Sequence, residues 1–219
     1  MIVSMALADR ETAQVEDTLF EVPRYRFTQH SEVFEDMFLM PQAEDAQSVE
    51  GRNSHHPIVL EGYKAAEFAA LIKVLYPTIE ELIEGTLKLT KEDWIGVLNL
   101  SKRWAMKNIR KHSIAKLSDM SLGPVEKVIL AREYEVANWL WEGLNEIISE
   151  DPIQSLAELK SQLGVDTACT LLWIQNQTLR TPPSAGFVLT IGMLGVVDGA
   201  SKKILEEFGD EITRYESWD

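Results

Sequence analysis

The chain has 219 residues, of which 45% are hydrophobic, so it can bury a substantial core in one large domain or two small ones. Its 35 acidic residues outnumber the 21 basic ones and give a formal charge of -14, which repels phosphate backbones and anionic lipid. The composition therefore argues against direct binding to nucleic acid or to a membrane surface.

The single cysteine, Cys169, makes a disulfide within one chain impossible. It lies in the apolar segment TACTLLWI, where we expect a buried, small hydrophobic side chain and not a catalytic thiol. We find no charged-then-apolar leader and no run of about 18 apolar residues of the kind that a membrane span needs. These features predict a protein of the cytoplasm or the nucleus.

The first elements predicted are two short strands followed by two short helices. Residues 12–22 alternate between apolar and polar around the turn EDT, which is typical of a β-hairpin. Pro23 suits the first turn of a helix, because the N–H that it lacks would have no partner there. Ser31 is suited to cap the next helix, with Glu32 near the positive helix end.

The segment SEVFEDMFLMP, residues 31–41, carries a wide apolar stripe for so short a helix. At about 100° per residue, Phe34 and Phe38 continue a line that starts at Phe27. A second line beside it consists of Val33, Met37 and Met40. We expect the first line to fill the core and the second to contact a second copy of the chain. The alternative is one wide core stripe in a monomer.

The middle of the chain predicts one more strand and then helices. HHPIVLEG, residues 55–62, is a strand candidate, and residues 65–76 have a helical apolar face that Pro77 ends. Three Thr or Ser residues precede an acidic residue with the spacing of a capping box. These pairs are Thr78 with Glu81, Thr90 with Asp93, and Ser155 with Glu158.

From residue 121 onward the pattern is helical. Gly123 and Pro124 suit the cap and the first position of one helix, and Asp166 is suited to cap a later one. The composition changes most sharply at SDMSLGP, residues 118–124, so we expect a domain boundary near Met120. Apolar residues on more than one face of the later helices predict that residues 121–219 form a helical extension packed on the first domain, residues 1–120.

The order of elements over residues 10–120 resembles a BTB (POZ) domain. The family's strand end followed by two helices is similar to the segment TLFEVPRYRFTQHSEVFEDMF. Its later strand and a helix ending in Leu-Tyr are similar to PIVLEGYKAAEFAALIKVLYP. LTKEDWIGVLNLSKRWAMKNIRKHSIAKL is similar to its closing helices and, in particular, to the large BTB group of mushroom-forming (basidiomycete) fungi. The resemblance implies an α+β fold with a small sheet of three to five strands and a helical cluster, followed here by an all-helical C-terminal extension.

The resemblance also implies a protein–protein interaction module that self-associates, commonly as a homodimer. Two positions depart from the family pattern. Pro23 stands where the family has His, and Arg10 stands where many members have Asp. The charged pocket found at some BTB dimer interfaces is therefore not expected here. The residues that the resemblance implies for the dimer interface are Tyr25, Val33, Met37 and Met40.

Some BTB proteins are adaptors that link a protein substrate to a cullin-type ubiquitin ligase. Their hydrophobic-x-Glu contact with the cullin falls here on Leu82 and Glu84, although a plain helical surface explains so Glu-rich a segment as well. The resemblance therefore implies two possible partners besides a second copy, a cullin scaffold and an unknown protein substrate. A homo-oligomeric scaffold that binds no cullin is the alternative.

We find no residue pattern that predicts catalysis, a metal site or a cofactor. His55 and His56 are adjacent, and adjacent residues of a strand point to opposite faces, so they are poorly arranged to share a metal. Trp139 and Trp141 are expected to be packing residues. An enzyme or ligand-binding protein in the helical half is the less favoured alternative, and a deep pocket with convergent ionisable groups would support it.

Overall fold

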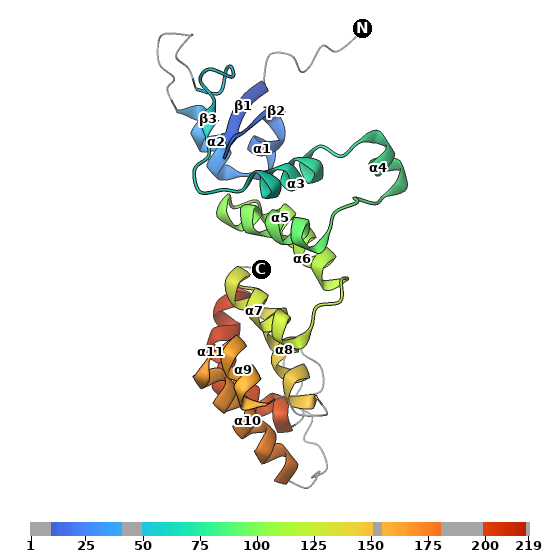
Figure 1. The fold of residues 1–219 in the computed structure, drawn as a ribbon, viewed down its shortest axis with the longest axis vertical. Coiled ribbons are helices and arrows are strands. Elements are labelled where there is room, and N and C mark those ends of the chain that lie inside the picture. Colours follow the sequence, from blue (N-terminus) through green and yellow to red (C-terminus); the bar gives the residue numbers. More distant parts are fainter. Residues whose placement is uncertain (1–9, 41–49, 151–154, 181–198, 218–219) are drawn as a thin grey trace. The chain divides into compact units, whose positions relative to one another are not determined.

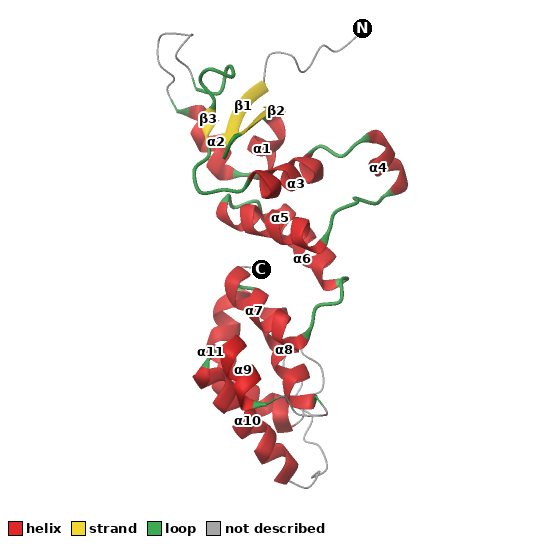
Figure 2. Cartoon of the chain, in the orientation of Figure 1, coloured by secondary structure: helices red, strands yellow, loops and turns green. Residues whose placement is uncertain are grey.

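The structure of the chain is a computed structural model that describes residues 10–40, 50–150, 155–180 and 199–217 (Figure 1). Its class is α+β, as expected, with one three-stranded sheet and many helices (Figure 2). The chain divides into two compact units, Met1–Met120 and Ser121–Asp219. Within the described ranges, no helix is both long enough and apolar enough to cross a bilayer.

The sheet lies in the first unit and has the strand order β2-β1-β3. Strand β1 runs antiparallel to β2 and parallel to β3, with Ala13 opposite Ile58 and Gln14 opposite Val59. The elements of this unit, in chain order, are β1 (Arg10–Val15), β2 (Thr18–Pro23), α1 (Tyr25–His30), α2 (Glu32–Leu39), β3 (Ile58–Val59), α3 (Ala65–Leu75), α4 (Ile79–Glu84), α5 (Lys91–Arg103) and α6 (Lys107–Ser118).

The β-hairpin is confirmed, with Glu16 and Asp17 as its two-residue turn. Glu16 has a φ of 52°, and its carboxylate accepts a hydrogen bond of 2.9 Å from the backbone N–H of Ala65, the first residue of α3. The expectation for Pro23 is wrong, because Pro23 ends strand β2 opposite Arg10 and the helix begins later. An edge strand tolerates proline because the missing N–H can face away from the ladder.

The core of the first unit is built from helices α3 and α5 and an aromatic cluster around Trp104. The Trp104 ring lies 5.0 Å from the ring of Phe34 and 5.9 Å from that of Phe68, both edge-on. Helices α3 and α5 approach closely at Gly96, where a Cβ would lie only 2.8 Å from the Cγ of Glu67. The expected face of α3 is largely confirmed, because Phe68, Leu71 and Leu75 are buried.

All regular secondary structure in the described residues of the second unit is helical. Pro124 is the first residue of α7, as expected, whereas Asp166 lies inside the first turn of α10 and does not precede it. The helices are α7 (Pro124–Tyr134), α8 (Ala137–Ser149), α9 (Leu156–Leu163), α10 (Val165–Arg180) and α11 (Gly199–Glu216). Helix α7 packs on α8 and α9, and α10 packs on α8, α9 and α11.

A buried core and ion pairs between helices, among them that of Arg132 with Glu211, hold this helical unit together. Trp139 is only 1% exposed, which confirms its packing role, and Trp141 is half-buried. The Arg132 guanidinium donates two hydrogen bonds, of 3.0 and 3.2 Å, to the two carboxylate oxygens of Glu211. It donates a third, of 3.0 Å, to the hydroxyl of Thr167, so a single side chain connects α7, α10 and α11.

Candidate functional site

Exposed apolar side chains on α1 and α2 form the first candidate site. Phe27 and Phe34 point inward and are 3% and 7% exposed, whereas other apolar residues of the same two helices face solvent. We define the α1–α2 surface by four side chains, Tyr25 (48% exposed), Val33 (47%), Leu39 (75%) and Met40 (63%). The two helices therefore carry an inner and an outer apolar set, while Met37 and Phe38 are half-buried between them.

Helix α2 is fixed to the rest of the unit through Ser31. As predicted, Ser31 caps the helix, because its hydroxyl oxygen accepts a hydrogen bond of 3.2 Å from the backbone N–H of Phe34. The same hydroxyl donates a bond of 2.6 Å to the backbone carbonyl of Trp104, which is 73 residues away in the chain. Because Ser31 is 2% exposed, this link holds the start of α2 against the turn between α5 and α6.

Helix α1 is fixed by its contact with the end of α3. The ring of Tyr25 lies edge-on to that of Tyr76, with 5.7 Å between the ring centres. The Tyr76 hydroxyl donates a hydrogen bond to the backbone carbonyl of Pro23, and burial raises the pKa of Tyr76 to about 12. The Tyr25 ring therefore packs on a tyrosine that is itself held by a hydrogen bond, which keeps the entropy cost of ordering Tyr25 in a contact low.

The two helices carry opposite charges around this surface. Arg24 and Arg26 flank Tyr25, and the Arg24 guanidinium lies 5.7 Å from the ring centre of Phe38 on α2. Helix α2 bears only acidic residues among its charged positions. These residues, all exposed, are Glu32, Glu35 and Asp36.

Helix α4 forms the second candidate site and buries none of its residues. Thr78 and Glu81 form the predicted capping box, and Gly85 ends the helix with a φ of 66°. Figure 1 shows α4 extending away from α3 and α5, between the loops of residues 76–78 and 85–90. We define the α4 surface by its three most exposed aliphatic residues, Ile79 (72%), Leu82 (65%) and Ile83 (80%).

Sequence reasoning missed part of each surface. Leu39 is the most exposed apolar residue of α2, but at about 100° per residue it belongs to neither apolar line. The hydrophobic-x-Glu pattern selects Leu82 and Glu84 and gives no role to Ile79 and Ile83. The spacing of Ile79, Leu82 and Ile83, at i, i+3 and i+4, is the signal that could have identified one helix face.

The residues considered for chemistry are dispersed. His55 and His56 do not lie in a strand but in the turn before β3, where the Asn53 side-chain oxygen accepts hydrogen bonds of 2.9 and 3.1 Å from their backbone N–H groups. Cys169 is exposed, which corrects the expectation of burial, because the core-facing residues of α10 are its neighbours Ala168 and Leu171. Among the described residues, no three His, Cys, Asp or Glu side chains lie close enough to hold a metal ion.

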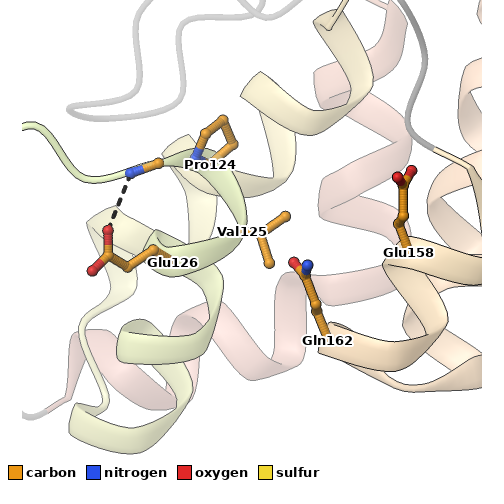
Figure 3. Close-up of a pocket in the computed structure, with 6 residues that line it drawn as sticks. Pro124, Val125, Glu126, Glu158 and Gln162 are labelled. Carbon is orange, nitrogen blue, oxygen red and sulfur yellow. Dashed lines mark hydrogen bonds between the residues drawn. The ribbon is translucent and has the colours of Figure 1, made fainter.

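A shallow depression in the second unit, of about 390 Å³, lies between α7 and α9 (Figure 3). The two carboxylates that line this depression, those of Glu126 and Glu158, already accept hydrogen bonds from the N-terminal caps of α7 and α9. Glu126 accepts a hydrogen bond of 3.4 Å from the N–H of Gly123, and Glu158 accepts from both the N–H and the hydroxyl of Ser155, at 3.0 and 2.8 Å. The bonds from Ser155 lower the pKa of Glu158. Figure 3 shows the two carboxylates at opposite sides, with Val125 and Gln162 between them.

The chain was also compared with known proteins. No protein-family model matches it, and no curated protein matches its sequence.

Proposed function

We propose that the chain is a protein–protein interaction module of the BTB type, which self-associates through the α1–α2 surface. One observation carries this proposal. Short helices that fill the core with Phe27 and Phe34 also expose large apolar side chains, of which Leu39 and Met40 are 75% and 63% exposed. Covering such side chains stabilises an association by about 25 cal/mol per Å² of apolar area removed from water.

The order of elements supports the BTB assignment. A hairpin, two short helices, a strand parallel to β1, the helix α3, the short helix α4 and a closing helical hairpin follow one another in the first unit. This is the order in which the BTB-like motifs occur in the sequence. Methionine at position 40 suits a contact between proteins, because its side chain is unbranched and adapts to the surface it meets.

Sedimentation velocity at micromolar concentration tests the proposal. We expect the full chain to sediment as a dimer, and the double variant Leu39→Glu, Met40→Glu to sediment as a monomer with an unchanged circular dichroism spectrum. The double variant Leu82→Glu, Ile83→Glu is the matched control, because it places the same two charges at similarly exposed positions outside the α1–α2 surface, and it is expected to remain dimeric. A wild-type chain that is monomeric throughout would contradict self-association.

A second candidate function is that of a cullin adaptor, with the α4 surface as the cullin contact. Its support is that Leu82 is 65% exposed on a helix that buries none of its residues, with Glu84 two positions later. In this function the helical second unit would hold the protein substrate. We expect the N-terminal region of a cullin to be captured by the wild type and by Leu39→Glu, but not by Leu82→Asp. If the wild type captures no cullin, the homo-oligomeric scaffold is the function that is left.

A further inference from the structure

We propose that charge selects and orients the self-association, with α1 of one copy lying against α2 of the second copy. Arg26 of α1, and Arg24 just before that helix, would then meet carboxylates of α2 across the interface. This inference rests on the proposed function, since it specifies which partner the α1–α2 surface accepts. The partner is a second copy of this chain, and the argument comes from the charges around the surface.

The charges of the two helices are completely separated. From residue 24 to residue 30, the charged side chains are the two arginines Arg24 and Arg26, and there is no carboxylate. From residue 31 to residue 40 there are three carboxylates and no basic residue. Two helices with opposite charge, side by side on one surface, form a self-complementary pattern, because a two-fold axis can bring each against the other.

The direction of the carboxylates disfavours a contact of α2 with α2. Phe34 faces the core, so the positions two residues before and after it, Glu32 and Asp36, point away from the core at about 100° per residue. Both are exposed, as is Glu35. Placing α2 of one copy against α2 of the other would bring like charges together, which costs association free energy, whereas α1 against α2 pairs opposite charges twice.

The arginines are held beside the apolar side chains that the interface would cover. The Arg26 guanidinium donates hydrogen bonds of 3.2 Å to the hydroxyl of Tyr25 and 3.4 Å to the side-chain oxygen of Gln29, both neutral acceptors. It also lies 5.3 Å from the centre of the Tyr25 ring. Arg24 lies 3.8 Å from a carboxylate oxygen of Glu11, so we expect Arg26 to be the more important contact with the second copy.

A charge-exchange experiment tests this arrangement on the full chain. The first variant carries Arg24→Glu and Arg26→Glu, so that both helices are acidic, and the second carries Glu35→Lys and Asp36→Lys, so that both are basic. Each variant alone would place like charges together, and we expect its dimer Kd to rise about tenfold or more. An equimolar mixture would form the mixed dimer in excess over either homodimer, measured by native mass spectrometry with one variant mass-tagged.

The matched control reverses charges of the same unit outside the surface. Lys73→Glu and Glu80→Lys are expected to leave the dimer Kd unchanged and to show no preference for the mixed dimer. If a reversed variant loses helical signal, the neutral pair Arg26→Gln and Asp36→Asn replaces it, with a weaker dependence of the dimer Kd on NaCl concentration as the expected result.

The outcomes distinguish this inference from the proposed function. A wild-type chain that is monomeric overturns self-association itself. A wild-type dimer whose charge-reversed variants dimerise equally well, with no excess of the mixed dimer, leaves self-association intact and overturns the pairing of α1 with α2. Preferential binding of the surface to a different protein, with the wild type monomeric, would also overturn it.

Discussion

At the scale of single residues, Ser31 has two structural roles, as the cap of α2 and as a link to Trp104. Ser31→Ala is expected to lower the free energy of unfolding by about 1–3 kcal/mol, because it removes a cap and leaves a buried carbonyl without its donor. Urea denaturation followed by tryptophan fluorescence measures this loss.

The control is Ser155→Ala, which removes an exposed cap of α9. The Ser155 hydroxyl donates to the carboxylate of Glu158 within the same capping box and not to a buried backbone carbonyl. We expect it to cost about 0.5–1 kcal/mol. Equal losses in the two variants would mean that the bond from Ser31 to Trp104 adds nothing to stability.

A second prediction at this scale concerns His112, whose ring lies edge-on to Trp94 at 5.4 Å between ring centres. Partial burial, and secondly the charge of Lys116, lower the pKa of His112 in the folded protein. The neutral form is therefore favoured by folding, so its contribution to stability is present above the unfolded pKa of about 6.5 and is lost as the pH falls below it. We expect the urea midpoint to fall less between pH 7.5 and 5.5 in His112→Gln than in the wild type.

An NMR titration of the His112 ring provides the direct check on this prediction. Its midpoint should lie below that of the denatured chain. A midpoint at or above the denatured value, or identical pH dependence in the two proteins, would contradict it.

At the scale of elements, the contact between α7 and α8 depends on Gly143. A Cβ there would lie 2.7 Å from the carbonyl oxygen of Pro124 and 2.8 Å from a methyl carbon of Val128, so Gly143→Ala must push the two helices apart. We expect a loss of about 1–3 kcal/mol in the free energy of unfolding.

Gly209→Ala is the matched control, because it makes the same change within α11, where a Cβ would have no neighbour within 4 Å. It is expected to stabilise the protein by about 0.5–1 kcal/mol through higher helix propensity. Thermal and urea denaturation should therefore show shifts of opposite sign, and shifts of the same sign would contradict the packing argument.

Elements that depend on neighbouring residues could be predicted from the sequence. The three capping boxes and the hairpin are of this kind, since their partners lie within a few residues. The position of Pro23 and the exposure of Cys169 could not, because they depend on which strand lies beside β2 and which face of α10 meets other helices. The α1–α2 surface shows the same difference. Helical periodicity identified Val33 and Met40, whereas Leu39 belongs to neither apolar line, and its exposure depends on which elements pack beside α2.

At the scale of the whole molecule, the sequence predicts that the helical extension packs on the first domain. If so, calorimetry of the full chain will show one transition, and Leu98→Ala in α5 and Leu140→Ala in α8 will both lower its midpoint. Both leucines are 0% exposed, so each change is expected to cost about 2–5 kcal/mol. Two transitions, each lowered by only one of the variants, would show that the units unfold independently and would refute the packed arrangement.

The long reach of the bond from Ser31 to Trp104 has a consequence for synthesis on the ribosome. The hairpin can form as soon as it emerges, but the hydroxyl of Ser31 must wait for a carbonyl made 73 residues later. At about 5–20 residues per second, this interval is roughly 4–15 s. During that time the nascent chain exposes Phe27 and Phe34, because Phe68, the partner of Phe27, is translated partway through the interval and Trp104, the partner of Phe34, only at its end. This is therefore the period in which a chaperone would bind the chain.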